Sequence, residues 1–260
     1  MEEGRKYEEF KNKNQFRLTD TAVTVELVAC LPEPDYHSTM AAVNCYSPAQ
    51  QLSELKKIAS SKKNLLDKVI KSGHHSIIEF AFFVFYISNI DRATSHQLVR
   101  HRIASYAQQS QRYVDASNFR YTVPISIQRM ENIFLRDQVL RHVEEAFKLY
   151  GELIEAEISK EDARFLLPNA TTTNIVVGMN ARSLMNFFER RCCYRAQGPI
   201  REVAYKMLAL CKQESPIIFK NAGPYCKRHG YCPEENKCSQ MKNVPQLAEL
   251  LEQYHRKERR

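Results

Sequence analysis

Runs of apolar and β-branched residues, separated by polar segments, predict three strands. Residues 23–30 alternate around β-branched side chains, which is typical of a strand with one buried face. Residues 80–87 (FAFFVFYI) are continuously apolar and rich in aromatic and β-branched side chains, which predicts a buried strand. Residues 171–177 complete the predicted set of strands.

Apolar side chains recur at helical spacing over most of the other segments. Ser47-Pro48 offers a start for one helix, because proline is tolerated at the first helical position, and Asp91 is a candidate N-cap for another. The predicted helices are 48–58, 65–70, 91–97, 133–156, 161–167, 181–193, 199–211 and 246–258. This mixture, without a repeat, predicts a single α+β domain over residues 1–220, followed by a Cys-rich extension, 221–260, with a polar helix.

Composition excludes several classes of protein. The chain has 260 residues, a net charge of +8 and seven glycines, no two of which form a Gly-x-Gly pair. A dinucleotide-binding fingerprint and a Walker loop are therefore excluded, so any phosphate must be held by side chains and helix ends. The longest apolar run is too short to span a bilayer. The first residues lack an apolar signal core, so we expect a cytoplasmic protein without a membrane partner.

Residues 100–112, RHRIASYAQQSQR, concentrate groups that bind anions. Arg100, Arg102 and Arg112 carry guanidinium forks, which donate two parallel hydrogen bonds to a phosphate or a polarised carbonyl. The polar residues between them suit a loop or a strand edge against a ligand. A basic helix end whose charges are solvated by water explains the same composition, and the residues alone leave both interpretations open.

Another arginine is notable for its position on a predicted helix. Arg191 follows Phe187 and Phe188 at helical spacing, so we expect it on the face that these aromatic side chains bury. A buried arginine is costly unless it is paired or faces a ligand. A structural ion pair with Glu189 or Glu202 and a role in ligand binding are the two alternatives.

Four motifs occur in the order found in one known family. Arg-His-Arg, seven further residues and then Ser110 resemble the signature of the flavin-dependent thymidylate synthases. Residues 73–79 are similar to the Gly-His-x-Ser/Thr-x-x-Glu segment of that family, residues 163–168 to Ala-Arg-x-x-Leu-Pro, and residues 180–184 to Asn-Ala-Arg-Ser-Leu. The likeness extends over residues 21–219. It implies the fold of that family, with a central antiparallel or mixed sheet flanked by helices.

The resemblance also assigns residues to a cofactor, FAD, and a substrate, dUMP. By this likeness the FAD-binding residues are Ser76, Arg100, His101, Arg102, Gln108, Asn180, Arg182 and Asn186. The dUMP-binding residues are Gln97, Leu98, Val99, Arg100, Gln108, Gln109, Ser110, Gln111, Arg112, Arg164 and Arg191, with Arg112 and Arg164 as phosphate ligands. His74 is expected near the folate or the flavin ring, or is a structural histidine. No metal is assigned to the site.

By the same resemblance, Arg191 is catalytic. It would face the uracil ring and stabilise negative charge there, so that carbon 5 becomes nucleophilic without a cysteine. The implied reaction is the reductive methylation of dUMP to dTMP, with 5,10-methylenetetrahydrofolate as carbon donor and NADPH-reduced FAD as hydride source. The family assembles as a homotetramer with sites shared between subunits. Gln108 departs from the glutamate that many members carry, which leaves the local proton balance open.

The chain contains eight cysteines, two of them adjacent at Cys192 and Cys193. In the cytoplasm they should be reduced. A thiol beside Arg191 is compatible with the cysteine nucleophile of the classical thymidylate synthases, although nothing else in the chain resembles that family. Small core residues are the alternative.

Three further cysteines lie in the predicted extension. Cys226, Cys232 and Cys238 recur every six residues, with His229 between the first two. Three thiols and an imidazole can bind zinc tetrahedrally. The spacing differs from that of C-x2-C knuckles, so free thiols or a redox-sensitive loop are the alternatives.

A basic nucleic-acid-binding protein with a Cys-rich tail is the alternative function, because the net charge of +8 favours anionic partners. The flavoenzyme interpretation implies no nucleic-acid partner. The colour of the purified protein separates the two: we expect a yellow protein with flavin absorbance. A colourless protein that takes up no FAD and binds oligonucleotides with a steep salt dependence would favour the alternative.

Overall fold

The structure, a computed structural model, describes residues 23–62, 64–116, 120–236, 238–239, 243–247 and 249. The strands are β1 (Thr24–Cys30), β2 (Phe82–Asp91), β3 (Ser105–Gln108) and β4 (Thr172–Asn180). The α-helices are α2 (Pro34–Tyr46), α3 (Leu52–Ser61), α4 (Leu65–Lys71), α5 (Arg92–Leu98), α6 (Ile125–Gln128), α7 (Ile133–Glu155), α8 (Lys160–Ala163), α9 (Ala181–Arg191), α10 (Gly198–Glu214) and α11 (Tyr225–His229). Two 3-10 helices are η1 (His75–Phe80) and η3 (Arg164–Leu166). Within these residues, no helix has both the length and the apolar character needed to cross a bilayer. Most of the predicted helix 246–258 lies outside the described residues.

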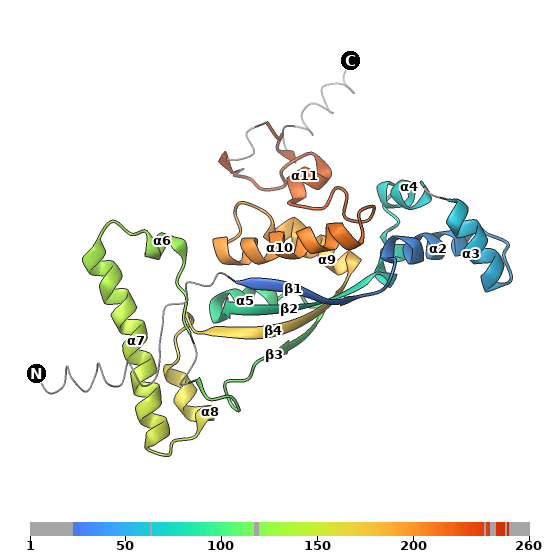
Figure 1. Ribbon diagram of the computed structural model, residues 1–260. Helices are drawn as coiled ribbons and strands as arrows, with labels where there is room; N and C mark the ends of the chain where they lie inside the picture. The colour runs from blue at the N-terminus through green and yellow to red at the C-terminus, as the bar shows by residue number, and fades with distance from the viewer. Residues whose placement is uncertain are drawn as a thin grey trace, which may run out of the picture. The chain divides into compact units, whose positions relative to one another are not determined.

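The four strands form one sheet in the order β1-β2-β4-β3 (Figure 1). Neighbouring strands run antiparallel, as backbone hydrogen bonds at their ends show: Leu31 N donates to Phe82 O at 3.1 Å, Ala181 N to Ala81 O at 2.7 Å, and Gln109 N to Asn174 O at 2.9 Å. The predicted α+β fold with a central antiparallel or mixed sheet is therefore confirmed.

The chain divides into two compact units, which are described separately. The first contains Tyr86–Arg100 and Tyr106–Val176, and the second contains Val25–Phe85, His101–Ser105 and the described residues from Val177 onward. In the first unit, α7 contacts α8 and η3. Its buried side chains form one cluster around Phe147 and Tyr121 and another around Tyr150. These clusters hold the segment that carries Arg164.

In the second unit, α9 contacts α10, α11 and η1. Four phenylalanines that are inaccessible to solvent form its aromatic core, with ring centroids 5.5 Å apart between Phe83 and Phe219, 5.9 Å between Phe219 and Phe188, and 5.7 Å between Phe188 and Phe187. Edge-to-face packing of this kind adds to the free energy gained by burial. The core face of α9 is thus fixed, and its polar residues face elsewhere.

Two strands lead directly into the helices that carry the predicted motifs. Asp91 ends β2 and caps α5, because its carboxylate accepts a hydrogen bond from Thr94 N at 2.7 Å. Asn180 ends β4 and caps α9 in the same way, accepting from Ser183 N at 2.9 Å. Each cap satisfies a backbone amide that the first turn of a helix leaves unpaired. The predicted start of each helix is confirmed.

The predicted helix start at Ser47-Pro48 is wrong. Ser47 ends α2 in an extended conformation, as is usual for the residue before a proline, and the next helix begins only at Leu52. The helix α2 itself was not predicted. The residues that α2 buries include Ser38, Thr39 and Ala42, so the helix lacks the apolar stripe by which such elements are recognised.

Other predicted boundaries differ by a few residues. The buried strand predicted over 80–87 begins at Phe82 and continues to Asp91, because residues 75–80 form η1 instead. Residues 161–167 form α8 and η3 rather than one helix. The short helices α6 and α11 have too few turns to show a periodic pattern.

The contact of α2 with the end of α10 yields a prediction. The carboxylate of Asp35 accepts hydrogen bonds from Ser215 Oγ, from Ile217 N at 2.9 Å and from Ile218 N at 3.2 Å. We expect Asp35→Ala to lower the free energy of unfolding by about 1–3 kcal/mol, because it leaves these donors without their acceptor. Urea denaturation measures the loss.

Asp67→Ala provides the control. Asp67 forms an accessible i,i+4 ion pair with Lys71, 2.7 Å long, and such pairs contribute little. An Asp35→Ala protein as stable as the Asp67→Ala protein would contradict the bridging role of Asp35.

Candidate functional site

The second unit contains a cavity of about 490 Å³, lined by residues of η1 and α9, by Ile103 of the Arg-His-Arg segment, and by Arg228. Three of the residues expected to bind FAD, namely Asn180, Arg182 and Asn186, line it together. Apolar surface comes from Ile103 and from side chains such as that of Met185. Small-molecule sites are typically cavities of about 300–1,000 Å³ that combine apolar walls with a few polar groups. The residues present therefore fit a bound cofactor.

The polar face of α9 carries these groups because its other face is packed into the aromatic core. Arg182 is exposed and forms an ion pair with Glu79 of η1. Asn186 Oδ1 accepts a hydrogen bond from Arg190 Nε at 3.2 Å. The guanidinium and amide groups are thus oriented before any ligand is bound.

The predicted catalytic residue, Arg191, ends α9 and meets the Arg-His-Arg motif. Its Nε donates a hydrogen bond to His101 Nε2 at 3.0 Å. The imidazole also packs edge-to-face on Phe187, with ring centroids 5.0 Å apart, and Phe187 is fully buried. The aromatic core therefore supports the histidine, and the histidine orients the arginine.

Electrostatics favours this arrangement only if the histidine is neutral. Burial, together with the nearby Arg191 and Arg190, lowers the pKa of His101 to about 4. Burial and Arg190 also lower the pKa of Arg191 from that of a free guanidinium. Because a neutral imidazole carries one nitrogen lone pair, His101 can accept the hydrogen bond of Arg191 at neutral pH.

In the first unit, α5 and β3 bring together residues expected to bind dUMP. Gln108 Nε2 donates to Ser95 Oγ at 3.0 Å, and Tyr106 Oη donates to the carbonyl of Leu98 at 2.9 Å. Burial raises the pKa of Tyr106 to about 12, so its hydroxyl remains a donor. Gln109 is held by its backbone against Asn174 of β4. This part of the motif is a packed strand edge.

The two predicted phosphate ligands lie close together. Arg112 forms a two-pronged ion pair with Glu161, at 2.8 Å and 3.0 Å, and Arg164 Nε donates to the carbonyl of Glu161 at 3.1 Å. Both guanidinium groups therefore converge on one residue. Burial, followed by the charge of Arg164, lowers the pKa of Arg92, which places a third arginine near them.

Gln111 is the most buried polar side chain among the predicted dUMP ligands, with 8% of its surface exposed. Its Nε2 has no hydrogen-bond partner among the described residues. A buried donor that is left unpaired is costly. An acceptor supplied by a ligand would relieve that cost, which fits a nucleotide base.

The other predicted ligands are distributed as follows. Gln97 and Leu98 belong to α5, Val99 caps its C-terminus, and Arg100 follows as an exposed residue. Ser76 is an exposed residue of η1, and the exposed His74 is its N-cap. Ser110 Oγ accepts from Arg112 N at 3.2 Å. Arg102 is exposed, next to Ile103 of the cavity. The Arg-His-Arg motif divides between the units, with Arg100 in the first and His101 in the second.

The ion pairs considered for Arg191 involve other residues. Glu189 pairs with Arg228, and Glu202 pairs with Lys206. The adjacent thiol is unsuited to nucleophilic attack, because burial raises the pKa of Cys192 to about 12 and the thiolate is the reactive form. Cys192 is inaccessible to solvent, as expected of a core cysteine.

The Cys-rich segment does not form a ready-made metal site in the described part of the chain, where no three His, Cys, Asp or Glu side chains are arranged to hold an ion. His229 instead contacts Glu189, with Nε2 3.0 Å from Oε1. The pKa of the Cys226 thiol is raised by burial and by three other thiols, those of Cys193, Cys232 and Cys238. All eight cysteines lie in the described part and are free.

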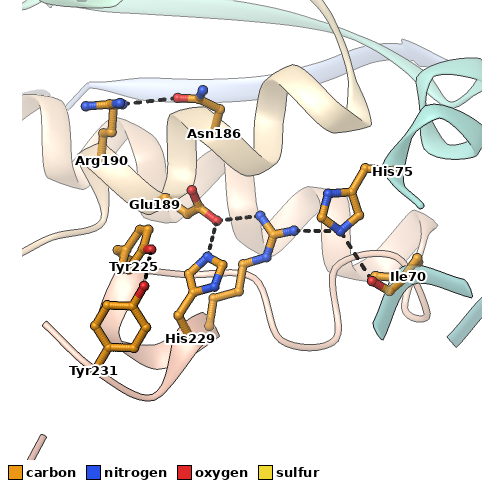
Figure 2. Close-up of polar contacts among 9 residues, drawn as sticks. Ile70, His75, Asn186, Glu189, Arg190, Tyr225, His229 and Tyr231 are labelled. Atoms are coloured by element: carbon orange, nitrogen blue, oxygen red, sulfur yellow. Dashed lines mark hydrogen bonds and ion pairs between the residues drawn. The ribbon is translucent and has the colours of Figure 1, made fainter. Parts of the chain in front are cut away.

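Sequence reasoning missed three residues of these sites. Arg92 was overlooked because it lies at a helix start, where a basic residue shows no pattern. Glu189 was considered only as a partner for Arg191, and Arg228 was not considered at all. These last two meet across 39 positions of the chain (Figure 2), a relation that local spacing does not reveal.

Comparison with known proteins identifies the family. Residues 26–217 match the family described as thymidylate synthase complementing protein, Thy1. The flavin-dependent thymidylate synthase of Geobacter sulfurreducens is 46% identical over 215 residues, which cover 81% of this chain and 90% of that protein. The enzyme of Nitratidesulfovibrio vulgaris is 42% identical, and the match covers 82% of this chain and 92% of that protein. The enzyme of Pyrococcus furiosus is 41% identical, and the match covers 82% of this chain and 91% of that protein.

The chain is an α+β protein with a polar small-molecule cavity and clustered arginines. Its similarity to these relatives shows that it is an enzyme. The chain belongs to the Thy1 family. The likeness on which the sequence analysis relied is therefore confirmed. None of these relatives supports the alternative of a nucleic-acid-binding protein.

The neutral state of His101 predicts a pH dependence of stability. The folded protein keeps His101 neutral down to about pH 4, whereas an unfolded histidine titrates near 6.5. Between these two pH values the unfolded state binds more protons than the folded state does. The free energy of unfolding is therefore highest above pH 6.5 and decreases as the pH falls to 4. We expect wild type to lose about 1–2 kcal/mol more stability than His101→Gln between pH 7 and pH 4, allowing for solvent screening of the partly exposed ring.

Urea denaturation at each pH makes this comparison. Glutamine retains an acceptor but takes up no proton, so His101→Gln is the matched reference. Equal losses in the two proteins would show that His101 is not held neutral.

Proposed function

We propose that the chain is a flavin-dependent thymidylate synthase, which converts dUMP to dTMP by reductive methylation. The carbon comes from 5,10-methylenetetrahydrofolate and the reducing equivalents come from NADPH. The observation that carries the proposal is the 3.0 Å hydrogen bond between Arg191 and His101, because it joins the Arg-His-Arg motif to the end of the helix that the Asn-Ala-Arg-Ser-Leu motif begins. The relatives that bear this name cover most of the chain.

FAD, once reduced, supplies the hydride in this reaction. Asn180, Arg182 and Asn186 would hold it in the cavity of the second unit, with Ser76 on the neighbouring η1. Arginine and asparagine side chains donate hydrogen bonds that suit a pyrophosphate and a ring carbonyl. The remaining predicted ligands, Arg100, His101, Arg102 and Gln108, are assigned to FAD by resemblance.

Arg112 and Arg164 would bind the phosphate of dUMP. Arg112 pairs with the carboxylate of Glu161, and Arg164 contacts the backbone carbonyl of the same residue, so an anion already occupies the position beside Arg112. A phosphate that binds there exchanges with this carboxylate, and Arg92 adds further positive potential. Gln111, with its unpaired Nε2, supplies a donor for the base.

Arg191 is the proposed catalytic residue. Its guanidinium would stabilise negative charge on the uracil ring when the N3 proton leaves, which raises the electron density at carbon 5. The neutral His101 contributes by holding Arg191 without neutralising its charge. No cysteine is needed, in agreement with the protonated state of the Cys192 thiol.

The other expected partners are part of the proposal. We infer a homotetramer with shared sites, which is supported by three consecutive exposed apolar residues at the start of α7, Ile133, Phe134 and Leu135. His74, exposed at the N-cap of η1, is accessible to folate or flavin. Gln108 retains an acceptor oxygen where the family resemblance implies a glutamate. The cytoplasmic location stays a prediction, as does the extension over residues 221–260.

Substitution of Arg191 tests the mechanism. We expect Arg191→Ala to lower the rate of dTMP formation by about 100-fold or more, because loss of one electrostatic stabiliser of a transition state has an effect of that size. The rate of flavin reduction by NADPH should remain near that of wild type. Product analysis and the loss of flavin absorbance measure the two steps separately.

Arg141→Ala, an exposed substitution on α7, is the charge-matched control and should retain full activity. Normal dTMP synthesis by Arg191→Ala would remove Arg191 from its catalytic role. A wild-type protein that makes no dTMP from dUMP, methylenetetrahydrofolate, NADPH and FAD would overturn the proposed function itself.

A further inference from the structure

Arg228 comes from a part of the chain beyond residues 26–217, which match the family. It lies on α11, and its Nη1 donates to Glu189 Oε1 of α9. Its Nη2 lies 3.2 Å from Nε2 of His75 on η1. The Arg228 guanidinium therefore contacts both Glu189 and His75, two residues labelled in Figure 2. One side chain from the C-terminal segment bridges the two elements that line the cavity.

The bridge is well shielded from water. The side chains of Arg228 and Glu189 are 14% and 17% exposed. An ion pair that joins α9 directly to η1, Arg182 with Glu79, is far more accessible, at 57% and 44%. Exposed pairs contribute little, whereas loss of one partner from a shielded pair leaves a charge without compensation. Of these two ion pairs, the one made by Arg228 is therefore expected to contribute more to holding the cavity walls in place, in addition to the direct packing of α9 on η1.

The helix that carries Arg228 is itself held in place. His229 Nε2 lies 3.0 Å from Glu189 Oε1, so Glu189 receives two contacts from α11. The ring of His229 stacks on that of Tyr225, with centroids 4.1 Å apart, and Tyr225 shares a 2.8 Å hydrogen bond with Tyr231. Figure 2 shows these aromatic groups beside Glu189. The short helix α11 is thus anchored to α9 by more than one group.

We propose that Arg228 is a positioning residue for the flavin site: by bridging Glu189 and His75 it sets the separation of α9 and η1 and so the shape of the cavity. This inference rests on the proposed function. Arg228 acts through its two partners, because its guanidinium is already engaged by them. The C-terminal segment is then part of the cofactor site, although it lies outside the family match.

The chemistry of His75 supports a role that responds to pH. Burial, followed by the charge of Arg228, lowers the pKa of His75, and Arg182 and Glu189 of α9 act in opposite directions on it. Its Nε2 also lies 3.2 Å from the carbonyl of Ile70 on α4. A neutral ring with the proton on Nδ1 accepts from Arg228, whereas a protonated ring donates to Ile70 and repels Arg228. The bridge is therefore complete only above the pH at which His75 titrates.

The test is the affinity for FAD, measured by quenching of flavin fluorescence in wild type and variants. We expect Arg228→Ala to weaken FAD binding by about 10-fold or more, because loosening the support of a binding site misplaces its ligands. Arg228→Lys should restore part of the affinity, since lysine keeps the charge toward Glu189 but lacks the planar fork. The dissociation constant for FAD should increase in wild type as the pH is lowered from 8 to 5, and it should remain constant in His75→Gln.

Lys227→Ala, an exposed substitution on the same helix, is the matched control and should bind FAD as wild type does. Circular dichroism shows whether Arg228→Ala is folded. Glu189→Gln provides a second variant, which keeps the shape of the side chain and should weaken FAD binding even if Arg228→Ala unfolds. Equal FAD affinity in wild type and the folded variants would overturn this inference alone. A wild-type protein that binds no FAD would overturn the proposed function and this inference with it.

Discussion

The hydrogen bond from Arg191 to His101 is the interaction on which the proposed chemistry depends. A guanidinium can polarise a substrate only if it is fixed in position and keeps its charge, and a carboxylate partner would offset that charge. A neutral imidazole fixes the arginine without doing so. The imidazole is neutral chiefly because it is partly buried, and it packs edge-to-face against Phe187 of the aromatic core. The proposed catalytic group is therefore supported by hydrophobic packing.

The arginines expected to bind ligands have a different arrangement. Arg182 pairs with Glu79, and Arg112 pairs with Glu161, in both cases at accessible positions. Exposed pairs of this kind are weak, so an incoming phosphate can take the place of the carboxylate at small cost. The lack of a Gly-x-Gly pair excludes the glycine-rich loops that cradle phosphates, so side chains and helix ends must serve instead. Charge pairing in the free protein keeps these side chains ordered.

The elements that sequence analysis predicted correctly are those with a strong local pattern. These elements are the strands β2 and β4, the long helix α7 and the capped helices α5 and α9. Each was predicted because its periodicity or its capping residue can be recognised within a short stretch of sequence. The helix α2 was missed because it buries hydroxyl and small side chains against its neighbours. The predicted start at Ser47-Pro48 failed because a proline restricts the residue before it as well as starting a helix.

For this protein, the sequence by itself determined the fold class, the family and the set of residues assigned to the ligands, since these depend on motifs that are contiguous in the chain. Only the tertiary structure decided which of these residues meet. The contacts of Arg191 with His101, of Arg112 with Glu161, and of Arg228 with Glu189 and His75 join distant segments. Local spacing carries no information about such pairs, because packing of the core sets their distances and their exposure to water.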